Sequence, residues 1–240
     1  MKISLVIPMY NESSIVKDAL ETYSTYMEKT FDDWELIFVD DGSKDGCGDV
    51  IREASEKDPR IRLEGYEVNR GKGFAVRTGV LASKGDLVIF TDCDNAYGED
   101  TIGRAVEQLK SSGADMLIGS RNLTKDGYKQ YTFMRRVASK TYIKVICLVA
   151  GFKLSDSQCG FKGFKGEVGR KLFSYSEVER FAFDLEIILL AQKAGYTITE
   201  MPVKIINHRE SKVSLARDAV KVLSDLRKMK KRIKKLDIRK

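Results

Sequence analysis

Short apolar runs alternate with segments of helical periodicity through the first part of the chain. Their β-branched composition predicts strands at residues 2–8, 34–39, 61–66 and 87–91. The intervening segments predict helices at 13–29, 48–57 and 73–83, the first capped by Asn11 or Ser13. Strands and helices that alternate in this way predict a doubly wound α/β sheet with mostly parallel strands.

The pattern changes after residue 100, where the elements become more varied. Helices are expected at 101–110, 133–150 and 183–193, strands at 115–119 and 197–206, and a polar loop at 155–162 leads into a short strand. We find no internal repeat and no low-complexity linker, which favours one main domain. The longest apolar run, 145–152, is far shorter than the roughly 20 residues of a membrane-spanning helix.

Carboxylates follow two of the predicted strands at the points where these strands end. Asp92 and Asp94 come after the apolar run 87–91, and Asp40 and Asp41 come after 34–39. Ligands of open α/β sheets bind at the carboxyl ends of the strands. Paired carboxylates there suit Mg²⁺ or Mn²⁺ shared with substrate phosphates. Such pairs also cap helices and form turns, so both interpretations stay open.

Gly71-Lys72-Gly73 opens a predicted helix and is a second candidate for phosphate binding. Backbone N–H groups at a helix start and a lysine both attract phosphate. A flexible turn with a solvated lysine is the alternative. The spacing fits neither a Walker loop nor a dinucleotide-binding glycine motif, because Val76 occupies the place of the third glycine.

The net charge of +7 is concentrated at the C-terminal end. Residues 221–240 hold ten Lys/Arg and two acids, whereas the first 220 residues hold 32 bases and 33 acids. This distribution argues against a nucleic-acid-binding core and favours a contact between the tail and an anionic surface. Four scattered cysteines and a start that runs directly into a strand, without a signal peptide, favour a cytoplasmic protein.

The tail, residues 213–240, has the pattern of a basic amphipathic helix. Its apolar positions follow one another at steps of three and four: Leu215, Ala219, Val222, Leu226, Met229, Ile233 and Leu236. The helix could pack on the body or form a coiled coil. It could equally lie on a membrane with its lysines facing anionic headgroups.

Five motifs in this order and spacing resemble the inverting family-2 glycosyltransferases with a GT-A fold, specifically the polyprenyl-phosphate (dolichyl-phosphate) sugar synthases. The motifs are Val6-Ile7-Pro8 with Asn11-Glu12, Val39-Asp40-Asp41-Gly42-Ser43, Asp92-Cys93-Asp94, Gly119-Ser120-Arg121 and Glu210-Ser211-Lys212. The resemblance covers about residues 3–212. Within the family, 156–162 and 180–186 look most like the dolichyl-phosphate β-glucosyltransferases.

The resemblance implies a division of the chain and a set of site residues. The GT-A domain would comprise 1–212, with a nucleotide-binding half at 1–95 and an acceptor-binding half at 96–212, followed by the tail. The nucleotide would contact Pro8, Tyr10, Asn11, Glu12, Asp40, Asp41, Gly71, Lys72, Asp92 and Cys93. The acceptor phosphate would contact Arg121, Arg135, His208, Arg209, Ser211 and Lys212.

For catalysis, the resemblance implies roles for Asp94, Arg121, Arg135 and Asp156. Asp92 and Asp94 would hold Mg²⁺ or Mn²⁺, which stabilises the departing diphosphate. Asp156 is either a general base or a positioning residue. Mannose synthases commonly carry a metal-binding Gln two residues after the second aspartate, whereas this chain has Ala96, so Asp94 could be the main protein ligand.

The expected function is therefore metal-dependent transfer of a sugar to a polyprenyl or dolichyl phosphate, on the cytoplasmic face of a membrane to which the tail binds. UDP-glucose is the favoured donor. Three alternatives remain open: a mannose synthase that uses GDP-mannose, a family-2 enzyme with a surface-glycan or soluble acceptor, and a non-catalytic protein that binds anionic surfaces.

Overall fold

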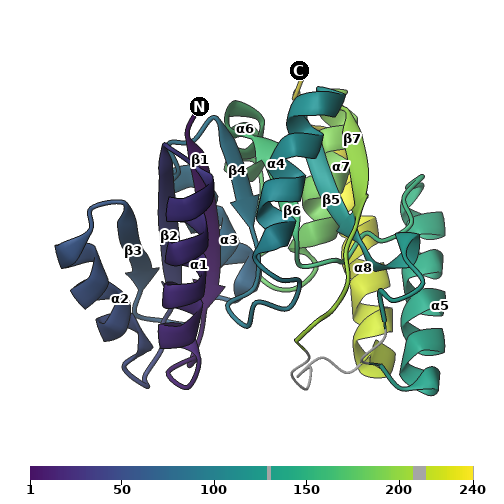
Figure 1. The fold of residues 1–240 in the computed structure, drawn as a ribbon. Helices are drawn as coiled ribbons and strands as arrows, with labels where there is room; N and C mark the ends of the chain where they lie inside the picture. Colours follow the sequence, from purple (N-terminus) through teal and green to yellow (C-terminus); the bar gives the residue numbers. More distant parts are fainter. Residues whose placement is uncertain (129–130, 208–214, 240) are drawn as a thin grey trace.

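A central sheet with helices on both faces forms the framework of the protein (Figure 1). This computed structural model describes residues 1–128, 131–207 and 215–239, and in the last range the side chains from residue 222 onward. The strands are β1 (Ile3–Met9), β2 (Trp34–Asp41), β3 (Ile61–Tyr66), β4 (Leu87–Phe90), β5 (Met116–Ser120), β6 (Lys162–Lys165) and β7 (Ile198–Pro202). The helices are α1 (Val16–Thr30), α2 (Cys47–Lys57), α3 (Lys72–Ala82), α4 (Asp100–Ser112), α5 (Phe133–Ala150), α6 (Gly166–Ser174), α7 (Phe183–Ala194) and α8 (Leu215–Lys234), with a 3₁₀ turn η1 at Arg121–Leu123.

The strand order is β3-β2-β1-β4-β6-β5-β7, and every neighbouring pair is parallel except the two that involve β6. The prediction of a doubly wound, mostly parallel sheet is thus confirmed. Because β6 is antiparallel to β4 and β5, the loop before β6 reaches the edge of the sheet where β4 and β5 end. The sequence pattern did not predict this reversal.

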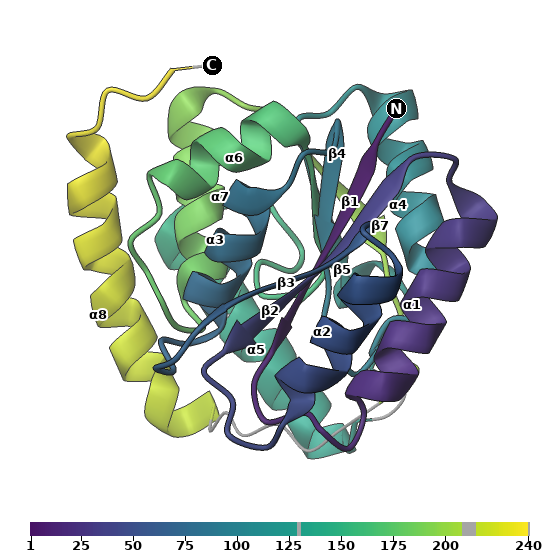
Figure 2. The ribbon, with the colours of Figure 1, turned by 90° about the vertical axis from the view of Figure 1, so that its left-hand side faces the viewer.

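Alternating side chains along the strands build two separate apolar clusters. Leu5 and Ile7 of β1 point to the face covered by α1, α2 and α4, whereas Val6 points to the face covered by α3, α6 and α7. Figure 2 shows these two groups of helices on opposite sides of the sheet. Strands buried on both faces must be apolar at nearly every position, which explains the continuous apolar runs of the sequence.

Most predicted elements agree with the structure, and three details were wrong. Strand β7 ends at Pro202, where its partner β5 ends at Ser120, so the predicted strand 197–206 was too long. Helix α6 was missed. The predicted cap of α1 does not form, because Asn11 and Ser13 bind the loop after β2.

The C-terminal helix α8 packs against α5 and α7, so its apolar stripe is covered by protein from residue 222 onward (Figure 1). Leu226, Met229 and Ile233 are buried in the core. From residue 222 onward, the helix therefore packs on the α/β domain, which was one of the arrangements that its sequence allowed. None of the helices in the described ranges has the length and the apolar composition that crossing a membrane requires.

Glu186 of α7 joins the C-terminal helix to the segment that precedes α7. Its buried carboxylate accepts hydrogen bonds from Ser176 Oγ at 2.6 Å and from the backbone N–H of Val178 at 2.9 Å. The same carboxylate pairs with Arg232 of α8, which also donates to the carbonyl of Tyr175 at 3.1 Å. The buried carboxylate of Glu186 therefore connects α7, the segment before α7 and α8.

Removing the side chain of Leu226 tests whether α8 is part of the body. Leu226 is fully buried, so Leu226→Ala should lower the free energy of unfolding by about 2–4 kcal/mol, measured by urea denaturation. The matched control is Lys228→Ala on the exposed face of the same helix, which should change it by less than about 0.5 kcal/mol. Equal effects of the two variants would show that α8 is not packed on the core.

Candidate active site

A cavity of about 1080 Å³ opens at the carboxyl ends of β1, β2 and β4 and extends to α5. Many of the predicted site residues line it, namely Pro8, Tyr10, Asn11, Glu12, Asp41, Gly71, Lys72, Asp92, Cys93, Asp94, Arg121 and Arg135. Asp40 and Asp156 are not among its lining residues. His208, Arg209, Ser211 and Lys212 lie outside the described residues.

Several lining residues were not predicted as site residues. They are Tyr97, Tyr131, Ser139, Tyr142, Gln158, Arg180, Phe181, Asp184 and Asn207, among others. The spacing of Arg135, Ser139 and Tyr142 by four and three places them on one side of α5. This periodicity was present in the sequence and could have indicated that α5 forms a wall of the cavity.

The loops after β1 and β2 are joined at one end of the cavity. The backbone N–H of Lys44 donates to Asn11 Oδ1 at 2.9 Å, and the N–H of Ser13 donates to Asp45 Oδ2 at 2.8 Å. Asp40 accepts from the N–H of Ser43 at 2.8 Å. These contacts explain why Asp40 shapes the loop without lining the cavity.

Asp41 fixes the position of the segment that begins α3. Its buried carboxylate accepts from Tyr66 Oη and Asn69 Nδ2, each at 2.7 Å. It also accepts from the backbone N–H groups of Arg70 at 2.8 Å and Gly71 at 2.9 Å. Its oxygens are therefore engaged within the protein, and its effect on the cavity is to hold Gly71 and Lys72 at the wall.

Lys72 forms an ion pair with Asp92, so it is not the solvated lysine of the alternative interpretation. Burial lowers the pKa of Lys72, but the negative charges of Asp92 and Asp184 outweigh this and raise it above its usual value. Asp184 in turn pairs with the fully buried Lys162. Asp92, Lys72, Asp184 and Lys162 thus form a chain of alternating charges.

Asp94 has an excess of negative charge around it. Burial, followed by the charge of Asp92, raises the pKa of Asp94 to about 6, although Lys72 and the N–H of Ala96 oppose the shift. A partly buried carboxylate of this kind fits a divalent cation. In the described ranges, no group of three or more His, Cys, Asp or Glu side chains could hold a metal. The residues therefore fit an ion that Asp94 and Asp92 share with substrate phosphates.

Gly160 allows the loop before β6 to approach Asp92. A Cβ atom at this position would lie 2.4 Å from Asp92 Oδ2 and 3.2 Å from Lys72 Nζ. The backbone N–H of Gly160 donates to Tyr97 Oη at 3.1 Å, which fixes the loop from its other side. Any larger residue at this position would displace the Asp92 carboxylate from its ion pair with Lys72.

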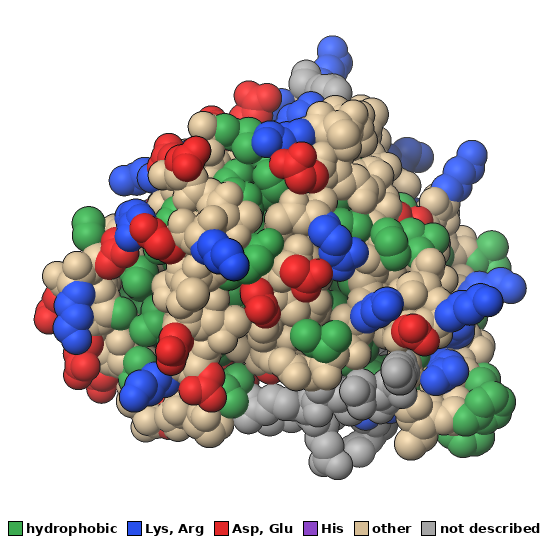
Figure 3. Space-filling model, viewed as in Figure 1, with side chains coloured by type: hydrophobic (Ala, Val, Ile, Leu, Met, Phe, Trp, Pro, Cys, Tyr) green, Lys and Arg blue, Asp and Glu red, His purple; other side chains and the backbone are tan. Residues whose placement is uncertain are grey.

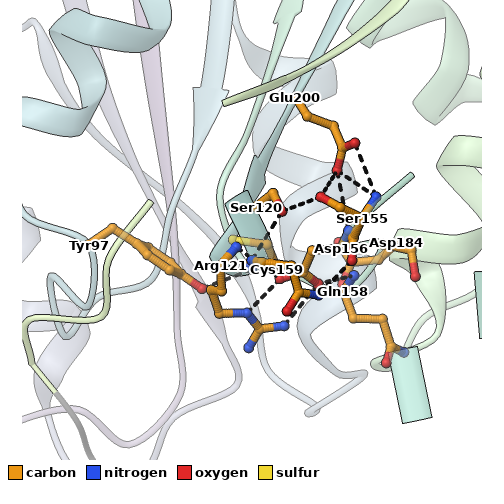
Figure 4. A network of polar contacts seen from close by, with 12 residues as sticks. Tyr97, Ser120, Arg121, Ser155, Asp156, Gln158, Cys159, Asp184 and Glu200 are labelled. Carbon is orange, nitrogen blue, oxygen red and sulfur yellow. Dashed lines mark hydrogen bonds and ion pairs between the residues drawn. The ribbon is translucent and has the colours of Figure 1, made fainter. Parts of the chain in front are cut away.

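Asp156 lies behind Arg121 and is fully buried (Figure 4). Its Oδ2 accepts from Arg121 Nε at 2.7 Å, and its Oδ1 accepts from Arg121 Nη2 at 3.0 Å. Oδ1 also accepts from the N–H of Gln158 at 3.2 Å. A carboxylate that is saturated in this way and does not line the cavity is poorly placed as a base. The geometry favours the positioning role.

Glu200 of β7 holds the loop that carries Asp156, and the sequence analysis did not identify it (Figure 4). It accepts from Ser155 Oγ at 2.7 Å and from the N–H groups of Ser155 at 2.9 Å and Asp156 at 3.2 Å. Ser155 Oγ also lies 2.6 Å from Ser120 Oγ. Contacts between residues about 45 positions apart have no local sequence signal.

Comparison with known proteins agrees with this geometry. The model of glycosyl transferase family 2 matches residues 4–173, and the chain belongs to this family of enzymes. A dolichyl-phosphate beta-glucosyltransferase of Trichomonas vaginalis is 31% identical, with 93% of this chain and 69% of the relative covered. Another of Dictyostelium discoideum is 31% identical, with 93% and 72% covered.

Solved structures show the same GT-A fold. Glucosyl-3-phosphoglycerate synthase of Mycobacterium tuberculosis, crystallised with Mn²⁺ and UDP-glucose, matches with a TM-score of 0.68 at 17% identity. The match covers 94% of this chain and 78% of that one. The predicted fold and the prediction of a glycosyltransferase are confirmed, and the alternative of a non-catalytic protein was wrong.

Asp94→Asn should abolish glycosyl transfer and yet stabilise the metal-free protein. Because the pKa of Asp94 is raised to about 6, its stabilising contribution is complete below the unfolded pKa near 4 and is lost as the pH rises through 6. At pH 7.5 the ionised carboxylate costs about 3 kcal/mol. In chelator, the variant should therefore melt at a higher temperature than wild type at pH 7.5, and the difference should fade toward pH 4.

The control for this prediction is Asp237→Asn, at an exposed carboxylate far along the chain. It should change neither transfer nor melting. A variant at Asp94 that keeps full activity, or that melts below wild type at pH 7.5, would contradict the assignment.

Proposed function

We propose that this family-2 enzyme transfers glucose from UDP-glucose to a polyprenyl or dolichyl phosphate, with Mg²⁺ or Mn²⁺ as cofactor and inversion to a β-linked product. One observation carries the proposal. The lining of the main cavity includes Asp92 and Asp94 after β4 and the guanidinium groups of Arg121 and Arg135 toward α5. This polarity suits a metal-bound diphosphate at one end and an anionic acceptor at the other.

The donor end is formed by the joined loops after β1 and β2, by Lys72 and by the Asp92–Asp94 pair. The loops would offer backbone groups and Glu12 to the nucleotide, and Lys72, which lines the same cavity, would approach its phosphates. When bound, the metal ion would neutralise the departing diphosphate. Asp94 would hold it, with Asp92 beside it.

The acceptor end is formed by Arg121 and by Arg135, which lies over the ring of Tyr131 at 4.5 Å. A phosphate monoester has a second pKa near 6, so at pH 7 its oxygen is already a charged nucleophile. That oxygen forms the new bond to the anomeric carbon as the bond to the diphosphate breaks, and no proton has to move. Asp156 then serves to orient Arg121. On the resemblance alone, we assign His208, Arg209, Ser211 and Lys212 to the same phosphate.

The identity of donor and acceptor is supported by the relatives. The two curated relatives described above are named for transfer of β-glucose to dolichyl phosphate, and the solved neighbour was crystallised with UDP-glucose and Mn²⁺. A lipid-linked acceptor implies work at a membrane surface, which we place on the cytoplasmic side. The exposed lysines of α8 would add about 1 kcal/mol each near anionic lipids.

Transfer from radiolabelled UDP-glucose to a short polyprenyl phosphate in detergent tests the proposal. We expect label in the organic phase that requires Mg²⁺ or Mn²⁺ and disappears in chelator. GDP-mannose should be a much poorer donor. Arg121→Met should lose the activity, whereas Arg52→Met on the exposed face of α2 should keep it. Label that stays in water, or transfer only to a soluble sugar, would refute the lipid acceptor.

Asp156→Asn separates the positioning role from the base role. The amide of Asn has only one acceptor oxygen and cannot accept from both Nε and Nη2 of Arg121, so kcat/KM for the acceptor should fall by about 10- to 100-fold. The shape of its pH profile should not change, because no proton passes through Asp156. The matched control is Asp115→Asn, which weakens the ion pair of another buried aspartate, with the partly exposed Lys165, outside the cavity lining. Loss of the acidic limb in the variant at Asp156 would instead identify a base.

A further inference from the structure

Helix α5 has a second apolar face, which points away from the protein. Met134 is 78% exposed and Leu148 is 81% exposed, and Val137 and Val145 between them are also exposed. Their spacing of three, eight and three places them in one stripe along the helix. The opposite side of α5 is buried through Ile143 and Ile146. We call Met134, Val137, Val145 and Leu148 the outer stripe.

Basic residues predominate in the chain segment that carries the outer stripe. Between Asp126 and Asp156 the chain holds six Lys/Arg and no Asp or Glu. Lys140 and Lys144 flank the stripe, and with Leu148 and Phe152 they line a second cavity of about 470 Å³. Figure 3 shows hydrophobic side chains gathered over the lower end of α5, with Lys and Arg side chains above them along the same edge.

The C-terminal helix adds to this basic surface. Lys230 of α8 donates to the carbonyl groups of Val149 and Ala150 at the end of α5, at 3.2 Å each. Lys231, Lys234 and Lys235 on the same helix are exposed. The basic residues of the tail therefore belong to a helix that lies directly beside α5.

We infer that the outer stripe of α5 docks the enzyme on the surface of an anionic bilayer, with the neighbouring lysines at the headgroups. Exposed apolar side chains combined with predominantly basic charge match a surface that is apolar inside and negative outside. A second copy of this chain would bring like charges together, which argues against self-association through this face.

The position of α5 connects this surface with the active site. Arg135, Ser139 and Tyr142 line the main cavity from the protein-facing side of the same helix, together with the buried Ile143. A docked enzyme would therefore hold the cavity wall at the lipid surface, where a lipid-linked phosphate resides. Access to a lipid-linked phosphate rests on the proposed function. The docking itself can be measured without any substrate.

Vesicle sedimentation with the full chain tests the inference. The vesicles contain phosphatidylglycerol and phosphatidylcholine, and neither nucleotide nor acceptor is present. Replacing Met134, Val137 and Leu148 by Ser should weaken binding about tenfold or more, since their burial in the interface is lost. Lys140→Gln with Lys144→Gln should weaken it and reduce its dependence on salt. The control is Val68→Ser, at a side chain that is 72% exposed outside α5.

Each outcome decides the question. Wild-type sedimentation of the stripe variant, or a loss seen only after replacement of Lys231, Lys234 and Lys235, would overturn the inference in favour of the tail. A wild-type dimer that the stripe variant dissociates, without change in vesicle binding, would assign the face to a second copy. If the stripe variant transfers glucose in detergent but not to acceptor in vesicles, the inference is supported. Vesicle binding without transfer to any acceptor would refute only the proposed function.

Discussion

The reversed direction of β6 is the constraint on which the active site depends. Phe90 of β4 pairs with Lys162, the first residue of β6, so the loop before β6 meets β4 at the end that carries Asp92. This meeting places Gly160 against Asp92 and brings the loop with Asp156 to Arg121. A parallel strand of the same length would start at the other edge of the sheet, about 13 Å away. The aspartate pair after β4 and the guanidinium group of Arg121 lie in one cavity because this one strand is antiparallel to its neighbours.

Most charged side chains of the site form ion pairs with their neighbours, whereas negative charge is in excess at Asp94. Lys72 lies between Asp92 and Asp184, and Lys162 compensates Asp184 from the core. Buried charges are costly unless they are paired, and these pairs form between separate elements of the fold. At Asp94, burial and the charge of Asp92 outweigh the opposing charge of Lys72 and raise the pKa to about 6. The protein thus tolerates an unfavourable charge where a substrate-bound cation would relieve it.

Local patterns predicted most of the fold, because apolar periodicity reports which side of an element is buried. They also predicted the cavity, because the motifs lie at strand ends and helix starts. They could not predict the direction of β6, since the four residues Lys162–Lys165 show the same alternation in either direction. Nor could they assign Asp41 to the segment before α3 or Glu200 to Ser155. The outer stripe of α5 was overlooked because an amphipathic helix is expected to have a single apolar face.

The link from Arg232 through Glu186 means that the C-terminal helix is not an exchangeable module. Glu186 fixes Ser176 and Val178, and the same segment continues into Arg180 and Phe181 of the cavity wall. A chimaera that receives the C-terminal helix of a relative would inherit a different partner for this carboxylate. Positions 186 and 232 should therefore be transplanted together, and among relatives they should vary as a pair.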